Sequence, residues 1–495
     1  MESTTPRRRR PSALKTSPEI QPTPPTPHAS PNRATASSVP GAATLPRPKH
    51  PRRTPFAPQN SILSDPASPH SLRGFLVFFW IGMAWYLVAT LYHAHRTGGH
   101  LLRPELLGIL AHDTWTLVFG DLAMVAGCAV AFLIQRDVCT GLVPLAWAGF
   151  VGIMWEATWF TYWMVWIWYR RWTWLQTGFM TLHTISNLMK QHSYLMTNTE
   201  LHFKRQHLAT LSASKVALSA ETRAHVEILT AELKGRWTGV DFPNQLTFWN
   251  FVDYMLVPTL VYELDYPRTK QLRNVFHRQS EHQINLSRNR FQPFALLEKF
   301  FSTFLTFTLL CATVDHYILP VLQISKELDW IGSVIYLIMP FMVCFLLLFL
   351  IIFECICNAF AELTCFADRT FYEDWWNSST FDQFARRWNK PVHEFLLRHV
   401  YLESISTTKA SKESATLVTF FVSSVFHEFA VFMVGKRFRP WLFMFQMLQI
   451  PLIYMMRVPF MRKQRLFGNA LFWFAMFLGP PLMTALYARE HFLEL

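Results

Sequence analysis

Long, uncharged hydrophobic runs are the feature that most limits what this chain can fold into. A helix needs roughly twenty apolar residues to cross the hydrocarbon core of a bilayer. Eight runs approach that length, and they are continuous rather than alternating in period two, which excludes a β-barrel. We predict spans at Leu72–Tyr92, Thr114–Ile134, Gly141–Trp168, Phe300–Leu322, Trp330–Ile356, Thr416–Val434, Trp441–Met456 and Leu466–Tyr487, with a borderline run at Phe248–Leu264.

Composition and charge placement support a membrane protein. Hydrophobic residues make up 51% of the chain and charged residues only 16%, whereas soluble domains carry about 25% charged residues. The net charge of +13 gathers at helix flanks, as at Arg170, Arg171 and Lys436, which is typical of contact with anionic lipid heads rather than nucleic acid. The predicted fold class is therefore all-α: a polytopic helical membrane protein with about eight or nine transmembrane helices.

The first 71 residues differ in composition from the rest of the chain. They hold 16 of the 30 prolines and ten Lys or Arg against three acidic residues, with almost no apolar clustering. Such a segment buries too little surface to offset its ordering entropy. We predict a disordered, basic cytoplasmic tail at 1–71, without a secretory signal peptide, followed by one membrane domain at 72–495.

A second polar region lies between the third and fourth predicted spans. Residues Trp172–Asn198 mix Trp and Leu with His and Lys, and they predict an amphipathic helix on the membrane surface. Residues Glu200–Lys234 intersperse Glu, Lys and Arg, and they predict a soluble helix.

A histidine stands inside one predicted span. His427 lies near the middle of Thr416–Val434, beside Glu428. Ionisable groups at membrane depth are expensive and normally face a protein interior or a wet cavity. Ser423 and Ser424 precede His427 by four and three residues, so the three share a helix face. The alternative is a buried histidine that only helps helices to pack.

The polar block 368–412 carries the densest chemical signal. It reads FYEDWWN at Phe371–Asn377 and RRWNKPVHEF at Arg386–Phe395. An interfacial aromatic belt explains tryptophans such as Trp375 and Trp376. It does not explain why Asp374, Asn377, Asn389 and His393 gather in the same block.

Several ordered motifs resemble one family. FYEDWWN resembles the signature of the membrane-bound O-acyltransferase family, in its sterol and diacylglycerol acyltransferase branch. MKQHSY (Met189–Tyr194), PTLVYELDYPRT (Pro258–Thr269) and SSVFHEF (Ser423–Phe429) resemble other elements of that branch. The tail 438–487, with FQMLQIPL and GNALFWF, is most similar to fungal-type sterol O-acyltransferases. The resemblance covers residues from about 72 to the C-terminus.

The resemblance implies site roles residue by residue. It implies that His427 is the catalytic base and Asn389 the partner amide in a reaction chamber enclosed by the helices. It implies that the FYEDWWN block binds acyl-CoA or shapes its site, with His393 beside the chamber. The predicted substrate-binding residues are Tyr372, Asp374, Trp375, Asn377, His393, Ser423 and Ser424.

Elementary chemistry fits these roles. Transfer of an acyl group from a thioester to an alcohol requires a base for the hydroxyl proton and a donor for the developing oxyanion. Neutral imidazole carries no charge until the proton moves, so it suits a buried base. We favour direct attack because no serine or cysteine occurs in a nucleophile-elbow context. An acyl-serine at Ser423 or Ser424 stays open as an alternative.

Metal chemistry is not predicted. His427-Glu428 begins like HEXXH, but Val431 stands where the second histidine would be. We predict no metal and no cofactor, since acyl-CoA is a co-substrate in this chemistry.

Three functions remain in competition. The first is esterification of a sterol with a long-chain acyl group in the endoplasmic reticulum membrane, and the second keeps the family but takes diacylglycerol as acceptor. The third is a proton-coupled transporter with His427 in its relay, which is disfavoured because no internal repeat is evident. The expected partners are acyl-CoA, sterol and the bilayer, and the resemblance implies a homodimer or homotetramer.

Overall fold

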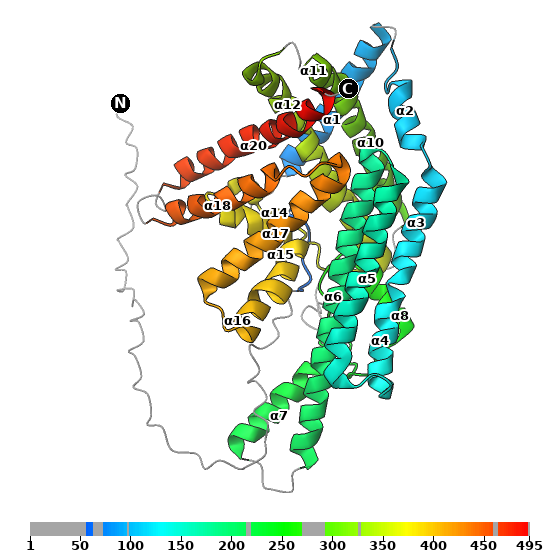
Figure 1. Ribbon diagram of the computed structural model, residues 1–495, viewed down its shortest axis with the longest axis vertical. Coiled ribbons are helices and arrows are strands. Elements are labelled where there is room, and N and C mark those ends of the chain that lie inside the picture. The colour runs from blue at the N-terminus through cyan, green and yellow to red at the C-terminus, as the bar shows by residue number, and fades with distance from the viewer. Residues whose placement is uncertain are drawn as a thin grey trace, which may run out of the picture. The chain divides into compact units, whose positions relative to one another are not determined.

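The computed structural model describes residues 56–62, 73–96, 99–213, 219–269, 293–324, 328–458 and 464–493, and this part of the chain is helical (Figure 1). The helices of the N-terminal half are α1 (Arg73–Arg96), α2 (Pro104–Ala111), α3 (Thr114–Gly127), α4 (Ala129–Thr140), α5 (Leu145–Arg170), α6 (Trp174–Ala213), α7 (Ala220–Glu232) and α8 (Phe248–Leu256).

The C-terminal half contains both longer rods and short turns. Its elements are α10 (Pro293–Thr313), η1 (Val314–Ile318), α11 (Leu319–Gln323), α12 (Trp330–Phe349), η3 (Leu350–Ile356), α13 (Cys357–Thr364), η4 (Trp375–Asn377), α14 (Phe381–Trp388), α15 (Lys390–Leu396), η5 (Leu397–Leu402), α16 (Glu403–Thr407), α17 (Lys412–Gly435), α18 (Trp441–Arg457) and α20 (Arg465–Leu493).

The predicted class, a polytopic helical membrane protein, is confirmed. Within the described ranges, five helical stretches are long and apolar enough to cross a membrane, and Trp441–Met456 is a shorter apolar helix. These five lie where the hydrophobic runs predict spans: Thr114–Thr140, Phe294–Gln323, Ile331–Thr364, Lys412–Gly435 and Arg465–Tyr487.

The predicted number of eight or nine spans is not confirmed. Helices α1 and α5 form at two further predicted runs, but the many Trp and Tyr residues and the acidic Glu156 make α5 less apolar. The borderline run Phe248–Leu264 is not a span, because α8 ends at Leu256, two residues before Pro258. Beyond Leu256 the chain is irregular and largely buried.

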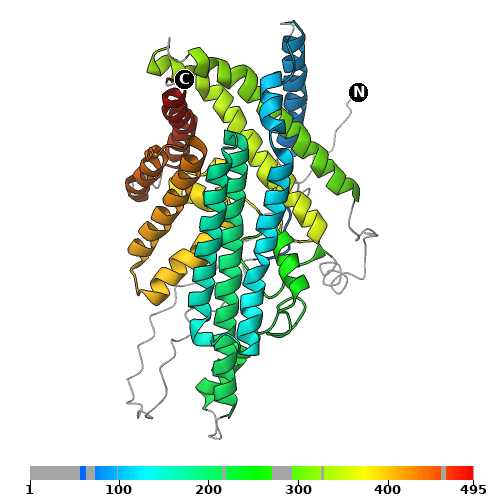
Figure 2. The same ribbon diagram turned by 45° about the vertical axis from the view of Figure 1, so that its right-hand side comes forward.

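The surface helix predicted at Trp172–Asn198 is wrong. This stretch belongs to the 40-residue helix α6, which runs back along α5 and also contacts α3, α4 and α17 (Figures 1 and 2). Buried residues occur along most of α6, including Thr184, Lys190 and Ser193. Lys190 and Ser193 tolerate burial because the segment 254–262 supplies hydrogen-bond partners for them, whereas Thr184 donates to the carbonyl of Met180 on its own helix.

In the described ranges, three of the helical rods contain a π-helical turn (η1, η3 and η5), a feature that often accompanies functional or strained sites. Each turn carries a buried or paired ionisable side chain. Asp315 in η1 pairs with Arg103, Glu354 in η3 is 7% exposed, and Arg398 in η5 pairs with Glu263. The widened helical turn therefore coincides with places where a polar group is directed into the protein.

A short segment departs from the tail predicted at 1–71. Residues 56–62 pack against the membrane domain: Phe56 contacts the rings of Tyr266 and Phe366, and Ser61 is 1% exposed. The backbone of Gln59 also pairs with Asp368. An apolar ring and a partnered hydroxyl let this segment bury surface that the proline-rich composition alone did not reveal. The rest of the predicted tail lies outside the described residues.

Candidate active site

His427 lies on helix α17 with one ring nitrogen already engaged. Its Nδ1 is 2.8 Å from the carbonyl oxygen of Ser423, and the side chain is exposed in the isolated chain. A carbonyl oxygen only accepts hydrogen bonds, so Nδ1 carries the proton and donates it. Nε2 of the neutral ring then keeps its lone pair, and no hydrogen bond to it is found from the described residues. This tautomer is the one that a general base requires.

Ser424 and Glu428 are on a different, buried part of the same helix. They are 1% and 4% exposed, respectively. The Glu428 carboxylate accepts the backbone N–H of Phe443 at 2.9 Å, near the N-terminus of α18, and the hydroxyl of Tyr487 at 3.0 Å. Glu428 therefore fastens α17 to α18 and α20. Glu428 therefore serves helix packing. The Ser424 hydroxyl is buried on the same side of the helix, away from the exposed ring of His427.

The FYEDWWN block is bonded to the stretch that carries Asn389. Lys390 donates its N–H to the carbonyl of Phe371 at 3.0 Å, and Glu373 donates its N–H to the carbonyl of Arg387 at 2.8 Å. The guanidinium of Arg387 adds an ion pair with Asp374 at 3.1 Å. The structure thus brings two separate parts of the polar block together.

Aromatic rings pack between the FYEDWWN block and the stretch that carries Asn389. Trp388 stacks on Phe345 at 4.5 Å between ring centroids and meets Trp375 edge to face at 4.9 Å. Trp375 is 2% exposed, so it packs in the protein core rather than against lipid headgroups. Asn377, by contrast, is exposed, and its amide lies 3.4 Å from Asp374.

Asn389 has a structural role that the sequence did not reveal. Its side-chain oxygen accepts the N–H of Val392 at 3.2 Å and caps the N-terminus of α15. Asparagine is among the best N-cap residues because its oxygen satisfies one of the free helix N–H groups. Among the described residues the amide nitrogen has no hydrogen-bond acceptor, so its N–H groups remain available to another molecule.

His393 follows one turn later on α15. Burial lowers its pKa below the ordinary histidine value, and the nearby cation of Arg386 lowers it further. The imidazole is therefore neutral at neutral pH. Burial also raises the pKa of the neighbouring Glu394.

The C-terminal helix docks on the FYEDWWN block through residues that were not predicted as part of the site. The amide nitrogen of Asn469 donates to the carbonyls of Trp376 and Ser378, each at 2.9 Å, and the indole N–H of Trp473 donates to Trp376 at 3.1 Å. A Cβ at Gly468 would collide with the backbone oxygen of Ser379. The GNALFWF motif therefore has a packing explanation.

Glu354 is a further residue that sequence reasoning missed. Its carboxylate accepts the hydroxyls of Ser61, at 2.5 Å, and of Tyr372. The signal was available, because Glu354 is an acid inside the apolar run Trp330–Ile356, as His427 is a base inside another run. Tyr372 itself is 1% exposed.

The MKQHSY motif supports a buried loop. The ammonium of Lys190 donates to the carbonyls of Tyr254, Met255 and Val257 at 3.0, 2.9 and 2.8 Å. These carbonyls end helix α8, where a cation is electrostatically favourable. Lys190 therefore caps this helix rather than facing a substrate.

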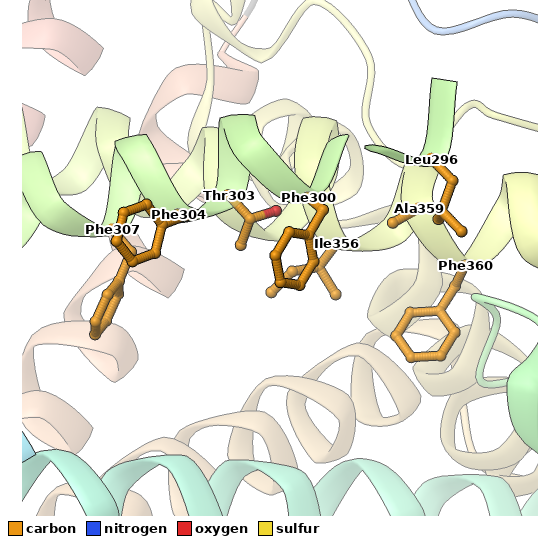
Figure 3. A pocket seen from close by; sticks show the side chains of 8 residues that line it. All are labelled: Leu296, Phe300, Thr303, Phe304, Phe307, Ile356, Ala359 and Phe360. Atoms are coloured by element: carbon orange, nitrogen blue, oxygen red, sulfur yellow. The ribbon is translucent and has the colours of Figure 1, made fainter. Parts of the chain in front are cut away.

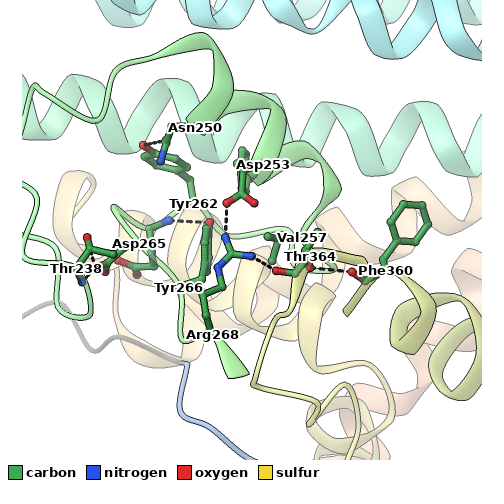
Figure 4. Close-up of polar contacts among 12 residues, drawn as sticks. Thr238, Asn250, Asp253, Val257, Tyr262, Asp265, Tyr266, Arg268, Phe360 and Thr364 are labelled. Atoms are coloured by element: carbon green, nitrogen blue, oxygen red, sulfur yellow. Dashed lines mark hydrogen bonds and ion pairs between the residues drawn. The ribbon is translucent and has the colours of Figure 1, made fainter. Parts of the chain in front are cut away.

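The irregular segment 257–268 that follows α8 is held mainly by side chains (Figure 4). The hydroxyl of Tyr266 accepts the N–H of Glu263 at 3.0 Å, and Arg268 bonds to Asp253 and to the carbonyl of Thr364. Buried backbone without regular structure needs such partners, since each unpaired group is costly. Further bonds are Tyr262 N–H to Ser193, Tyr266 hydroxyl to Val261 carbonyl and Tyr254 hydroxyl to Leu260 carbonyl.

The loop and the neighbouring helix α6 are both tied to η5. Arg398 pairs with Glu263 at 2.6 Å, and Nε2 of His399 lies 2.8 Å from the hydroxyl of Ser193. Because η5 continues α15 and packs against α17, the loop supports both elements that carry predicted catalytic residues. We call Lys190, Ser193, Arg398 and the segment 257–268 the loop cradle.

His427 and Asn389 are brought onto adjoining elements but not into contact. No hydrogen bond joins His427 to Asn389 or to the FYEDWWN block within the described part of the chain. Asn389 caps α15, α15 continues into η5, and η5 contacts α17. The described residues therefore make no hydrogen bond to the Nε2 of His427 or from the amide N–H groups of Asn389.

An apolar groove lies between α10 and the η3–α13 rod (Figure 3). It has a volume of about 370 Å³ and is lined by phenylalanines such as Phe300, Phe304 and Phe360. The hydroxyl of Thr303 already donates to the carbonyl of Lys299. The groove suits hydrocarbon, and it contains none of the predicted site residues. No cluster of three or more metal-ligating side chains occurs within the described ranges.

Comparison with known proteins identifies the family. A model of the membrane-bound O-acyltransferase family matches residues 151–489. This chain therefore belongs to the membrane-bound O-acyltransferase family, and the resemblance drawn from its motifs is confirmed. The match includes the FYEDWWN block, α15, α17 and most of α20.

Individual relatives narrow the branch. The chain is 32% identical over 486 residues to the probable sterol O-acyltransferase 1 of Schizosaccharomyces pombe, covering 87% of this chain and 85% of that protein. It is also 32% identical over 491 residues to sterol O-acyltransferase 2 of Saccharomyces cerevisiae, covering 92% and 70%. Diacylglycerol O-acyltransferase 1 of Bos taurus is 32% identical over only 260 residues, covering 51% and 48%.

Proposed function

We propose that this protein transfers a long-chain fatty acyl group from acyl-CoA to the hydroxyl of a sterol, with His427 as general base. The observation that carries the proposal is the hydrogen bonding of the His427 ring, which lies on a helix long enough to cross a membrane. Nδ1 donates to the carbonyl of Ser423, Nε2 has no hydrogen-bond partner among the described residues, and the helix belongs to the region that matches the family.

In the proposed reaction the sterol hydroxyl attacks the thioester directly, without an acyl-enzyme. Nε2 of His427 takes the proton of the sterol hydroxyl while that oxygen attacks the thioester carbonyl. The amide N–H of Asn389 donates to the oxyanion that develops. When the intermediate collapses, the C–S bond breaks and the proton passes from His427 to the departing CoA thiolate. The products are a sterol ester and CoA, without any net change in protons.

Acyl-CoA is proposed to approach through the polar block. Tyr372, Asp374, Asn377 and His393 line or shape its site in this proposal, with Trp375 as the packed centre that holds them. Ser423 contributes the carbonyl that orients His427, whereas burial of Ser424 favours a packing role. An acyl-serine on Ser424 would require the buried hydroxyl to become exposed.

The acceptor is assigned from the extent of similarity. Relatives named as sterol O-acyltransferases match along most of this chain, whereas the diacylglycerol enzyme matches about half of it at the same identity. Diacylglycerol remains the second candidate, because both acceptors are lipid alcohols that reach the site from the bilayer. We place the enzyme in the endoplasmic reticulum membrane with its N-terminus in the cytoplasm, as a homodimer or homotetramer.

One assay tests both the reaction and the base. Microsomes that contain the protein receive labelled oleoyl-CoA together with ergosterol, cholesterol or diacylglycerol in parallel. We expect labelled sterol ester with the wild type, and a loss of at least about 100-fold in His427→Ala, because a general base contributes 10²–10⁴-fold to the rate. His100→Ala, which removes an exposed histidine outside the site, is the matched control.

Two results would contradict the proposal. Ester formed only from diacylglycerol overturns the acceptor, and full activity of His427→Ala overturns the base. Protein amount in the membrane fraction is measured for each variant, so that loss of folding is not mistaken for loss of chemistry.

A further inference from the structure

The segment Phe56–Ile62 contacts two motifs that lie far away in the sequence. The N–H of Gln59 donates to the carbonyl of Ala367 at 3.1 Å, and the N–H of Arg369 donates to the carbonyl of Gln59 at 2.8 Å. The N–H of Ala57 donates to the carboxylate of Asp368 at 2.9 Å. Segment 365–369 thereby gains a backbone partner directly before the FYEDWWN block begins.

The other edge of 365–369 is paired as well. Its residues Cys365 and Ala367 bond to the backbone of Thr269 and Pro267, each at 3.0 Å. Phe56 closes this junction, with its ring 5.5 Å from Tyr266 and 5.8 Å from Phe366. Residues 56–62 therefore form a strap that completes a three-segment backbone arrangement. We refer to residues 56–62 as the strap.

The strap also supplies a hydroxyl to a buried carboxylate. Ser61 donates to Oε1 of Glu354 at 2.5 Å and lies 3.0 Å from the hydroxyl of Tyr372. Tyr372 donates to the same Glu354 oxygen. Ser61, Glu354 and Tyr372 are 1%, 7% and 1% exposed, so water does not readily replace a missing partner.

We infer that Ser61 is a positioning residue of the acyl-CoA site and acts through Glu354 and Tyr372. A carboxylate buried in a membrane helix depends on charge-assisted hydrogen bonds. Two hydroxyls share one oxygen of Glu354, so the position of Tyr372 depends on Ser61. The functional membrane unit then includes the strap. This inference rests on the proposed function, since it takes the FYEDWWN block as the acyl-CoA site.

The test uses the full-length chain and two neighbouring substitutions in the strap. Ser61→Ala removes the buried hydroxyl, whereas Asn60→Ala removes an exposed side chain from the same segment. We expect Ser61→Ala to raise the KM for oleoyl-CoA about tenfold, which corresponds to one charge-assisted hydrogen bond, with kcat changed less than about twofold. Asn60→Ala keeps wild-type constants.

A double-mutant cycle separates positioning from simple support of the fold. Ser61→Ala and Tyr372→Phe are measured alone and together, and we expect the combined rise in KM to be smaller than the product of the single effects. Residues that serve one partner couple in this way, whereas independent sites are additive.

The outcomes are distinct. Wild-type constants in Ser61→Ala, or additive effects with Tyr372→Phe, overturn the inference. A fall in kcat with unchanged KM, in proportion to lost folded protein, also overturns it, because that shows a structural role only. If the wild type itself esterifies no sterol, the proposed function fails first, and thermal unfolding midpoints of the same variants still report whether Ser61 and Tyr372 are coupled.

Discussion

The loop cradle and the candidate active site lie side by side but differ in how far their polar atoms are hydrogen-bonded by the protein. In the cradle, the ammonium of Lys190 has three carbonyl acceptors and Arg398 has a carboxylate partner. In the site, the hydrogen bonds made within the described part of the chain use one ring nitrogen of His427 and the side-chain oxygen of Asn389. Both regions carry motifs that resemble the family, so motif density alone does not distinguish them.

The difference indicates which motif residues have capacity left for chemistry. A buried polar group whose partners all come from the protein stabilises the fold, and its removal leaves those partners unsatisfied. A group that keeps an unused donor or lone pair beside an accessible face can act on another molecule. We therefore expect cradle variants to lose folded protein and site variants to lose rate.

The largest effect is expected in the cradle. Arg398→Ala leaves the carboxylate of Glu263, whose side chain is 6% exposed, without its cation. Breaking a buried ion pair in this way destabilises proteins by about 3–5 kcal/mol. We expect the thermal unfolding midpoint of the purified protein to fall strongly, while the activity per folded molecule is retained.

A surface pair provides the control for that variant. Arg386 pairs with Asp382 at 2.9 Å, but its side chain is 51% exposed, and such pairs contribute about 0–1 kcal/mol. Arg386→Ala should therefore hardly shift the midpoint. An equal shift in both variants would contradict the distinction between the cradle and the polar surface.

The next effect belongs to the site. Asn389→Asp keeps an oxygen that accepts the N–H of Val392, so the N-cap of α15 survives, but it removes the amide N–H groups. Loss of an oxyanion donor lowers kcat by about 100-fold or more. We expect this loss with little change in the unfolding midpoint, measured in the same preparation.

Removal of a helix cap outside the site should have the opposite effect, a loss of stability without a loss of rate. Ser219 caps α7, and its hydroxyl accepts the N–H of Thr222 at 3.1 Å. Ser219→Ala should destabilise the protein by about 1 kcal/mol and leave kcat unchanged. If Asn389→Asp keeps full kcat, Asn389 is a helix cap and nothing more.

The sequence predicted the helical membrane class and most long helices, because continuous apolar runs report burial in lipid directly. It also selected His427, since a base inside an apolar run is conspicuous. It did not predict that α6 is buried, because the partners Val257 of Lys190 and Tyr262 of Ser193 lie 67 and 69 residues further along the chain. Such partners depend on tertiary contacts that no local pattern contains.

The strap shows the same limit of local sequence patterns, because here a pattern predicted disorder where the chain docks on the domain. Phe56 and Ser61 sit in a proline-rich stretch that composition predicts to be disordered, and their partners are Phe366 and Glu354. The roles of Gly468 and Asn469 likewise follow from contact with the carbonyls of residues 376–379. Local composition describes the average behaviour of a segment, whereas single side chains determine whether part of it docks.

The smallest expected effect is a pH dependence of stability that comes from His393. This residue is a predicted site residue, but like Arg398 of the cradle it is half-buried. Burial lowers the pKa of His393 below its ordinary value, so as the pH falls below about 6.5 the unfolded chain takes up a proton that the folded protein resists. The contribution of His393 to stability should therefore decrease from pH 7.5 to 5.5, and His393→Gln should make the loss of stability over that range smaller. Unfolding midpoints at both pH values measure it, with exposed His100→Gln as control. An unchanged pH dependence in His393→Gln would show that this ring protonates freely and is not part of the desolvated block.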